Sequence, residues 1–309
     1  MAGPHPTYRE RFAQSQDGTR IGYRVYGDGP HWLVIANGLG ASYEVWDELF
    51  ELLAPHTQVL IWHYRGQYSS SRPADPSATS MADHCADLDV LLEQEGIKRY
   101  VLAGWSIGVQ VALAQYRRSS SRIDGLMLIN GAHDRLLENL FGLDAPKAIS
   151  RIARLLRTPL HYLAPRLEPL VHRLLDLPTT APLFEKLGMV RGGQAAFVRM
   201  AHEYAGLDFD ILLRWLVNAQ HHRTAEWLHC IRAPTLVTVG LHDRLTPPEG
   251  GLALKNRIPD VVWRPLPESA HFPMLEETAA LAEAMLEHLD RVYGRHTLAG
   301  VGPFEGEVG

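Results

Sequence analysis

Short runs of consecutive apolar residues alternate along the chain with longer segments whose apolar positions recur at helical spacing. The runs predict strands that are buried on both faces, and they occupy residues 32–36, 58–62, 100–103, 126–129 and 235–239, with a weaker run at 261–266. Residues 19–26 alternate instead, and we expect them to pair antiparallel with residues 7–14. Strand and helix patterns in alternation predict an α/β fold with a mostly parallel, twisted sheet and helices on both of its faces.

Helical patterns fill the segments between the predicted strands. They cover residues 43–54, 80–95, 107–118 and 276–293. The second of these begins at Ser80, with Asp83 three residues further on, which predicts an acidic variant of a capping box.

The alternation stops after residue 131 and resumes at residue 235. Residues 134–229 carry only helical patterns, among them the segments 149–156 and 208–217. We expect this block to form a helical cap that is inserted after the sixth strand. Open α/β sheets bind ligands beyond the carboxyl ends of their strands, so a cap at that edge would build the substrate pocket.

Two further ranges complete the predicted organisation. Residues 1–133 and 230–296 form the core, and the Gly-rich tail at 297–309 is expected to be poorly ordered.

The net charge of −5 argues against nucleic acid as the main partner, because proteins that bind it usually carry a basic excess. The N-terminus has no apolar run and no segment approaches a membrane span, so we expect a cytoplasmic protein without stable membrane insertion. Cys85 and Cys230 are predicted to be free, buried thiols, and a homodimer stays open.

Residues 104–108 read Gly-Trp-Ser-Ile-Gly and stand between a predicted strand and a predicted helix. A serine hydroxyl is a weak nucleophile, which must be presented to both a base and a substrate carbonyl. A sharp turn from strand to helix exposes the serine oxygen, and glycines two residues to either side leave room where the turn is crowded. We therefore predict that Ser106 is a catalytic nucleophile at a helix N-terminus, where N–H groups stabilise developing negative charge.

A carboxylate follows the strand predicted at 235–239. Asp243 lies in the loop just past that strand, which places it at the same sheet edge as Ser106, in the chain order serine, acid, histidine. Aspartate is also common in loops for its turn-forming hydrogen bonds, so this position alone leaves a structural role open. Asp134, after the run at 126–129, is the next candidate for the acid.

The base is chosen by its position, because the chain holds 16 histidines. His242, His271, His288 and His296 lie beyond residue 229. Only His271 stands in a loop between the last predicted strand and an amphipathic helix. A neutral imidazole there can take the serine proton at neutral pH, so we predict His271 as the general base.

An oxyanion hole needs two N–H groups, one after the nucleophile and one from the loop that follows an earlier strand. Ile107 supplies the first, and Leu39, in the loop after residues 32–36, is the candidate for the second. Trp105, beside the nucleophile, and Asn37 are candidates for contact with substrate, although Trp105 could equally pack beneath the turn.

Together the segments GWSIG, GLHDRLTP and SAHFPMLEE resemble the α/β-hydrolase superfamily, in its capped serine esterase, lipase and haloperoxidase-like branch. The resemblance covers about residues 7–293 and implies the fold and the triad of Ser106, Asp243 and His271. Fold alone does not name a substrate, because this architecture supports many chemistries.

Two positions depart from the pattern that the resemblance implies. The family often has His-Gly where this chain has Asn37-Gly38, and an asparagine amide can still brace that loop. It also often has Asp-x-Arg-Gly where this chain has His63-Tyr64-Arg65-Gly66. We expect a structural role for Arg65 and a local packing or hydrogen-bonding role for His63.

Other classes of protein fit the sequence less well. Gly38-Leu39-Gly40 follows a strand as a dinucleotide-binding loop would, but Tyr43 stands where the third glycine is needed. No metal-binding motif occurs, so neither a cofactor nor a metal is expected. A ligand-binding receptor without catalysis stays open as an alternative.

The sequence therefore predicts a serine hydrolase that cleaves small-molecule carboxylic esters, thioesters or lactones through an acyl-enzyme. Hydrolysis of a carbon–carbon bond, cofactor-free perhydrolysis and acyl transfer use the same residues and remain alternatives.

Overall fold

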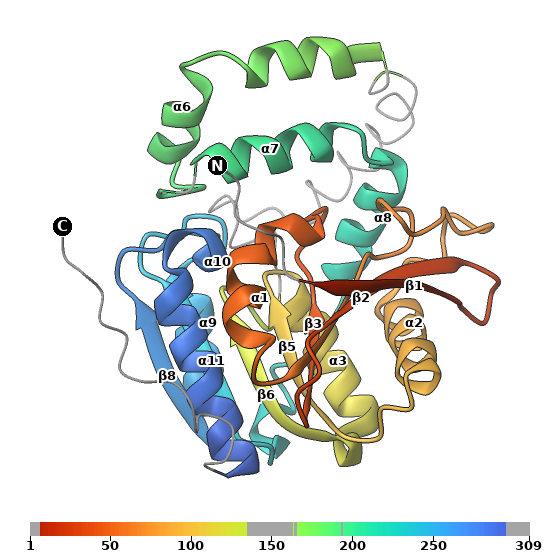
Figure 1. Ribbon diagram of the computed structural model, residues 1–309, viewed down its shortest axis with the longest axis vertical. Coiled ribbons are helices and arrows are strands. Elements are labelled where there is room, and N and C mark those ends of the chain that lie inside the picture. Colours follow the sequence, from red (N-terminus) through yellow and green to blue (C-terminus); the bar gives the residue numbers. More distant parts are fainter. Residues whose placement is uncertain (1–6, 135–162, 164–165, 193, 295–309) are drawn as a thin grey trace.

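A twisted sheet of eight strands forms the centre of the computed structural model, which describes residues 7–134, 163, 166–192 and 194–294 (Figure 1). The strands lie in the order β1-β2-β4-β3-β5-β6-β7-β8. Their bounds are β1 Tyr8–Gln14, β2 Arg20–Tyr26, β3 Trp32–Ala36, β4 Gln58–Trp62, β5 Tyr100–Trp105, β6 Ile123–Ile129, β7 Thr235–Gly240 and β8 Val261–Leu266. The strands from β3 to β8 pair in parallel, and β1 and β2 add an antiparallel hairpin at one edge. The predicted α/β fold with a mostly parallel sheet is confirmed.

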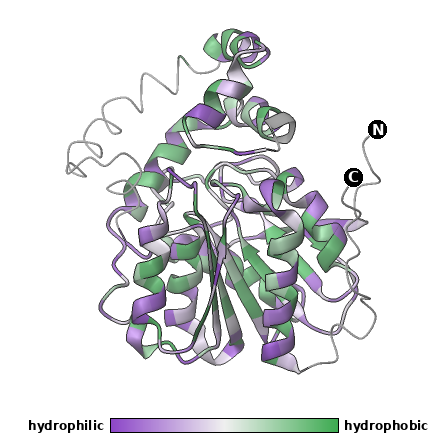
Figure 2. Ribbon diagram, turned by 90° about the vertical axis from the view of Figure 1, so that its left-hand side faces the viewer, coloured by the Kyte–Doolittle hydropathy of each residue, from purple (hydrophilic) through white to green (hydrophobic). Residues whose placement is uncertain are grey.

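The central strands are buried on both faces, as their unbroken apolar sequences require. All six residues of β5 and of β7 are buried, and β5 pairs with β3 on one side and β6 on the other. In Figure 2 the strands are mostly coloured as hydrophobic, whereas the flanking helices mix hydrophobic and hydrophilic positions. Successive side chains of a strand point to opposite faces of the sheet, and here they enter two hydrophobic clusters, one on each face.

Helices cover the two faces of the sheet in two groups. One face carries α1 Asp47–Leu53, α10 Pro273–Glu276 and α11 Thr278–Tyr293. The other carries α2 Met81–Gln94, α3 Gly108–Ser119 and α9 Pro248–Arg257. The capping box predicted for α2 is present, because the Asp83 carboxylate accepts the Ser80 backbone N–H at 2.7 Å and the Ser80 hydroxyl accepts the Asp83 N–H at 3.3 Å.

Several details of the secondary structure differ from the sequence prediction. Strand β6 begins at Ile123, before the predicted residue 126, and α10 and α11 together replace the helix predicted at 276–293. The helix predicted at 43–54 divides into a 3-10 turn, η1 Tyr43–Trp46, and α1. Strand β5 continues beyond the predicted residue 103 to Trp105. Helix α9 was not predicted, because Gly250 and Gly251 interrupt its apolar pattern; Gly251 is needed where the helix lies close to the Val239 side chain of β7.

Between β6 and β7 the chain forms helices that stand over the carboxyl edge of the sheet (Figure 1). Those described are the helical residues 166–175, α6 Thr180–Lys186, α7 Gln194–Ala205 and α8 Phe209–Ala219, followed by the 3-10 turn η3 Leu228–Cys230. The helix predicted at 149–156 and the tail at 297–309 lie outside the described residues, and the predicted limits of the cap at 134 and 229 stay a prediction.

Aromatic side chains connect this insertion to the loops and helices around the sheet. Trp215 of α8 packs on Tyr64 and His84, with ring centroids 4.1 Å and 4.4 Å apart. Phe197 of α7 meets Phe272 edge to face at 5.2 Å. Since Phe272 follows His271 in the chain, the insertion packs directly beside the predicted base.

Arg65 is a buried structural residue, as its position in the sequence suggested. It is 2% exposed, and its guanidinium donates to both carboxylate oxygens of Asp87, at 2.9 Å and 2.5 Å, and to Asp17 at 2.8 Å. Such a buried charge persists only when its donors are satisfied by acceptors of opposite charge. The cluster ties the loop after β4 to α2 and to the β1–β2 hairpin.

The two cysteines are both free, but only one is buried. Cys85 lies inside the protein, where burial raises the pKa of its thiol to about 12. Cys230 is exposed, so the prediction of a second buried thiol was wrong. It ends the η3 turn, whose buried residue is Leu228, and so the thiol points to the surface.

Candidate active site

The Gly-Trp-Ser-Ile-Gly segment forms a sharp turn between β5 and α3. Ser106 has a φ of 57°, in the left-handed region that a residue with a Cβ rarely adopts, and its backbone N–H donates to Ile129 O at 3.0 Å. Both glycines of the motif are required sterically. A Cβ on Gly104 would lie 2.3 Å from Gly108 O, and a Cβ on Gly108 would lie 2.0 Å from Ala36 O. The turn therefore presents the Ser106 hydroxyl at the carboxyl edge of the sheet.

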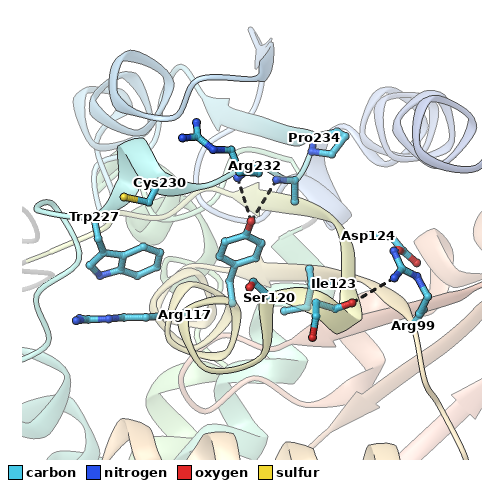
Figure 3. Close-up of a pocket in the computed structure, with 12 residues that line it drawn as sticks. Arg99, Arg117, Ser120, Ile123, Asp124, Trp227, Cys230, Arg232 and Pro234 are labelled. Carbon is cyan, nitrogen blue, oxygen red and sulfur yellow. Dashed lines mark hydrogen bonds and ion pairs between the residues drawn. The ribbon is translucent and has the colours of Figure 1, made fainter.

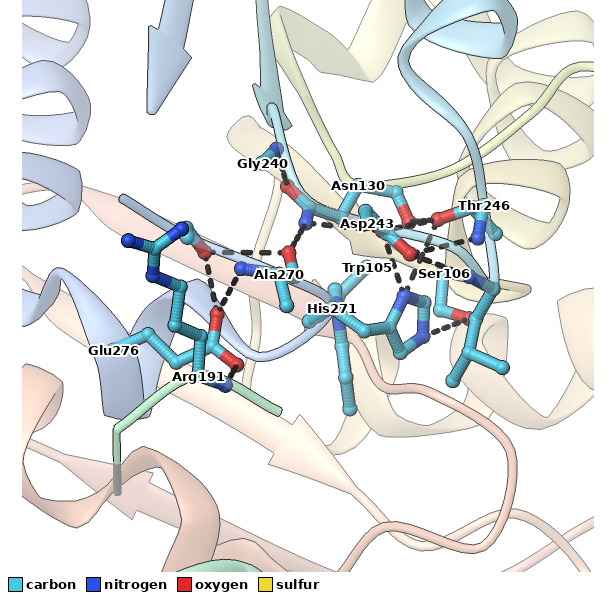
Figure 4. Close-up of polar contacts among 12 residues, drawn as sticks. Trp105, Ser106, Asn130, Arg191, Gly240, Asp243, Thr246, Ala270, His271 and Glu276 are labelled. Carbon is cyan, nitrogen blue, oxygen red and sulfur yellow. Dashed lines mark hydrogen bonds and ion pairs between the residues drawn. The ribbon is translucent and has the colours of Figure 1, made fainter. Parts of the chain in front are cut away.

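The imidazole of His271 faces the Ser106 hydroxyl across the carboxyl edge of the sheet (Figure 4). Its Nε2 lies 3.1 Å from Ser106 Oγ, which is within hydrogen-bond reach for proton transfer. The Trp105 indole N–H donates to His271 O at 3.0 Å, so the residue before the nucleophile also fixes the backbone of the base. The histidine is 5% exposed. The geometry places the predicted base beside the predicted nucleophile, whose side chain is partly accessible.

Asp243 completes the chain of hydrogen bonds. Its Oδ2 lies 2.8 Å from His271 Nδ1, and its Oδ1 accepts the backbone N–H groups of Leu245 and Thr246, each at 2.8 Å. The Thr246 hydroxyl lies 2.7 Å from Oδ2. Because Oδ1 is held by two fixed donors, Oδ2 is directed at the imidazole, which favours the tautomer with its proton on Nδ1 and leaves Nε2 free to accept.

The loop after β3 lies directly against the turn that carries Ser106. A Cβ on Gly38 would lie 2.5 Å from the Trp105 ring, so only glycine fits between loop and turn. In the described part of the chain, neither Leu39 N–H nor Ile107 N–H has a hydrogen-bond acceptor. Two free N–H groups beside a nucleophile are what an oxyanion hole requires.

The Asn37 side chain braces this loop from inside. Its Oδ1 accepts Gly38 N–H and the Trp46 indole N–H, both at 2.9 Å, and its amide donates to Ala41 O at 2.9 Å. Asn37 is 1% exposed and Trp105 is 2% exposed. Both predicted substrate contacts thus have their side chains within the protein, where they support the loop and the turn.

Comparison with known proteins identifies the family. The family model for the alpha/beta hydrolase fold matches residues 31–278. The chain belongs to the α/β hydrolase family. A relative named "Putative carbamate hydrolase RutD", from Variovorax paradoxus, is 26% identical over 286 residues, which are 87% of this chain and 96% of that protein.

Solved structures of the family share the fold of this α/β hydrolase. A thermophilic esterase from Thermogutta terrifontis superposes with a TM-score of 0.72 at 20% sequence identity, covering 92% of this chain and 99% of the esterase. The enol-lactonase from Burkholderia xenovorans LB400 gives a TM-score of 0.71 at 22% identity, covering 90% and 99% of the two chains.

Three residues near the triad of this α/β hydrolase were not singled out from its sequence. Asn130, Thr246 and Glu276 all hydrogen-bond to the segments that carry Asp243 and His271. The Asn130-Gly131 pair directly after β6 was an available signal, because asparagine before glycine marks a turn with positive φ. Thr246 and Glu276 lie within the motifs of the acid and the base, and no sequence pattern indicates their side-chain partners.

The Glu276 carboxylate holds the loop before the base. It accepts the Ala270 N–H at 2.5 Å and the Ser269 hydroxyl at 2.7 Å, while its other oxygen accepts the Arg191 N–H of the insertion at 2.8 Å. Burial raises the pKa of this carboxyl above its ordinary value. Glu276 therefore joins the loop of His271 to the insertion.

Asp134, the alternative candidate for the acid, and His63 both lie apart from these contacts. Asp134 accepts the Thr224 N–H at 2.7 Å and so contacts the segment between α8 and η3 rather than His271. His63 stacks on Tyr43 with ring centroids 3.5 Å apart and hydrogen-bonds to Ser69 at 2.8 Å, which is the local role expected for it. Burial lowers the pKa of His63 well below its ordinary value, so the ring stays neutral.

A separate cavity opens at the opposite end of the sheet, near the beginnings of β6 and β7 (Figure 3). Its volume is about 610 Å³, and none of the three triad residues lines it. Arg99 pairs there with Asp124, while the Tyr116 hydroxyl accepts the backbone N–H groups of Arg232 and Ala233.

Among the described residues no group of three His, Cys, Asp or Glu side chains could hold a metal ion. None of the described helices is long and apolar enough to cross a bilayer.

Proposed function

We propose that this α/β hydrolase cleaves carboxylic esters through an acyl-enzyme on Ser106. One observation carries the proposal: Ser106 Oγ, His271 Nε2, His271 Nδ1 and Asp243 Oδ2 form an unbroken chain of contacts at 3.1 Å and 2.8 Å. Three side chains that lie far apart in sequence have no packing reason to meet in this order at the edge of a sheet. The arrangement is that of a nucleophile, a base and an orienting acid.

The first half of the reaction forms the acyl-enzyme. Ser106 Oγ attacks the substrate carbonyl as its proton passes to His271 Nε2, and the new imidazolium is stabilised by the Asp243 carboxylate. The Leu39 and Ile107 N–H groups hold the negative charge that develops on the carbonyl oxygen. The imidazolium then gives its proton to the leaving alcohol, so the C–O bond breaks without release of a free alkoxide.

The second half regenerates the serine. His271 takes a proton from water, which attacks the acyl carbonyl, and the same N–H groups stabilise the second tetrahedral intermediate. The proton returns from the imidazolium to Ser106 Oγ as the acid product leaves. These residues supply every proton transfer in the cycle, and no step requires a metal or a cofactor.

The insertion is proposed to select the substrate. A cavity of about 480 Å³ lies beside Asp243 and Ala270, and residues of the insertion such as Gly188 and Arg191 form its other wall. Side chains from both parts therefore line one space next to the acid. Replacing the insertion should alter the preferred acyl or alcohol group more than it alters reaction with a small activated ester.

A screen of p-nitrophenyl esters with graded acyl chains tests the function, with lactones, thioesters and a p-nitrophenyl carbamate as further arms. The carbamate arm is included because the relative from Variovorax is named for carbamate hydrolysis. We expect turnover of at least one ester, lost in Ser106→Ala at unchanged thermal stability. Turnover that persists in that variant would remove Ser106 from the mechanism.

A further inference from the structure

Asn130 stands where the three chain segments of the triad meet. It follows the last residue of β6, and its neighbours contact the nucleophile: Ile129 O accepts the Ser106 N–H at 3.0 Å, and Gly131 has no room for a Cβ, which would lie 2.6 Å from Ser106 O. Asn130 is fully buried and has a φ of 41°. Asparagine is one of the few residues with a side chain that tolerate this conformation.

The contacts of the Asn130 side chain fix which way its amide points. Its Oδ1 accepts the Gly240 backbone N–H at 3.2 Å, and its Nδ2 donates to Ala270 O at 2.7 Å (Figure 4). A backbone N–H can only donate and a backbone carbonyl can only accept, so the amide cannot be turned over. The second hydrogen of Nδ2 is then directed at Asp243 Oδ2, 3.2 Å away.

That oxygen is the same one that faces the imidazole. Asp243 Oδ2 lies 2.8 Å from His271 Nδ1, so one carboxylate oxygen receives both the imidazole proton and the Asn130 amide. Gly240 belongs to the strand that leads to the acid, and Ala270 directly precedes the base. The Thr246 hydroxyl donates to the same oxygen at 2.7 Å, but within the residues that the structure describes only the Asn130 side chain contacts this carboxylate and also holds the segments of acid and base together.

We propose that Asn130 is a positioning residue of the Asp243–His271 pair, acting by donation to the carboxylate oxygen that orients the imidazole. The role deepens the proposed function and rests on it. The bond to Asp243 Oδ2 holds that oxygen toward Nδ1, and the bond to Ala270 O fixes the chain beside the base.

Two variants separate the side chain from the backbone conformation. Asn130→Gly tolerates a φ of 41° but removes the amide. Asn130→Asp keeps the size and the acceptor for Gly240 N–H, and its carboxyl can donate to Asp243 only while it is protonated. Asn218→Asp is the matched control. Asn218 lies in α8, and its amide donates to Thr79 Oγ1 at 3.0 Å, apart from the triad contacts.

Kinetics on a p-nitrophenyl ester give the first readout. We expect Asn130→Gly to lower kcat about 10–100-fold with KM nearly unchanged, as loss of a partner that orients a catalytic group typically does. The rate of fluorophosphonate reaction at Ser106 should fall by the same factor, while Asn218→Asp stays near wild type. Urea unfolding of each variant gives the folded fraction to which the rates are normalised.

The pH dependence gives a readout that a purely structural role would not move. Burial and the nearby Asp243 charge favour the protonated carboxyl in Asn130→Asp, and its single O–H can replace the amide as donor to Asp243 Oδ2, although it cannot donate to Ala270 O at the same time. The ratio of its kcat to that of Asn130→Gly should exceed one at pH 6 and should not rise toward pH 9. A ratio of one at every pH, or an Asn130→Gly rate within twofold of wild type, overturns the proposal.

Failure of the proposed function would be seen separately, as wild-type protein that neither turns over esters nor reacts with fluorophosphonate. The downfield proton NMR signal of His271 Nδ1–H then still tests Asn130. An upfield move of this signal in Asn130→Gly supports a role in holding the Asp243–His271 pair. An unchanged signal contradicts it.

Discussion

Replacing Asp243 by asparagine should remove the base without removing the histidine. The carboxylate Oδ1 accepts two backbone N–H groups, from Leu245 and Thr246, and in the Asp243→Asn variant these donors will retain the amide oxygen of the new side chain there. The amide NH₂ then takes the place of Oδ2, 2.8 Å from His271 Nδ1, where it faces the Asn130 amide at 3.2 Å and the Thr246 hydroxyl, which can turn to accept. Nδ1 becomes an acceptor, so the imidazole proton moves to Nε2 and faces Ser106, where a lone pair is needed.

The size of the effect follows from that forced tautomer. A histidine held in the wrong tautomer costs about 10⁴ in kcat, which corresponds to roughly 5.5 kcal/mol of transition-state stabilisation. Asp243→Ala leaves no NH₂ group opposite Nδ1, so its imidazole can still place a lone pair on Nε2. We therefore expect the alanine variant to retain more activity than the asparagine variant, although it removes more atoms.

Steady-state hydrolysis of the best p-nitrophenyl ester measures both variants, and urea unfolding controls for loss of folded protein. The order wild type, Asp243→Ala, Asp243→Asn in kcat is expected. A loss below tenfold in Asp243→Asn would show that this carboxylate does not set the tautomer. Both variants remove the charge, so an alanine variant less active than the asparagine variant would show that the space filled beside His271, rather than the proton position, is what matters.

Three further predictions concern stability and the oxyanion loop. Arg65→Met leaves the Asp87 carboxylate buried without its partner, so urea unfolding should show a loss of about 3–5 kcal/mol, part of which the Arg65→Met/Asp87→Leu double variant recovers. Burial lowers the pKa of His288 from its ordinary 6.5 to about 4. Below pH 6.5 the unfolded chain therefore binds a proton that the folded protein does not bind, and the free energy of unfolding decreases as the pH falls toward 4. The loss amounts to about 2 kcal/mol between pH 7 and pH 5, and it should be absent from His288→Gln in unfolding curves at the two pH values; equal losses would assign it elsewhere. Gly108→Ala places a Cβ 2.0 Å from Ala36 O, so the loop of Leu39 must shift and kcat should fall on the order of 10²-fold with the protein still folded, whereas an unaffected kcat would show that the loop is not part of the site.

Most of the sheet was predictable because each central strand is buried on both faces. Burial of that kind leaves an unbroken apolar run, as in residues 32–36 and 235–239, and both runs became strands within one residue of the prediction. The positions of Ser106 and His271 followed from the same strands, because parallel strands end at one edge. The arrangement of the triad was thus predictable from topology together with three short motifs.

The residues that sequence patterns did not predict act through specific side-chain geometry. Asn130 appears in sequence only as the start of a turn, and its contacts with Gly240 and Ala270 depend on the pairing of β6 with β7. Helix α9 lacks a clear apolar stripe because it needs glycine against the sheet. The exposure of Cys230 depends on the direction of a single short turn. None of these properties produces a regular spacing of apolar and polar residues, which is the signal that sequence analysis can detect.

Covalent capture of the nucleophile decides whether the triad works as proposed. The wild-type protein is treated with a fluorophosphonate, its intact mass is recorded, and the modified peptide is sequenced by fragmentation. We predict one adduct per chain, located on Ser106, with labelling lost in Ser106→Ala and strongly slowed in His271→Ala. An unmodified chain after prolonged exposure, or an adduct on any other residue, would contradict the proposed mechanism.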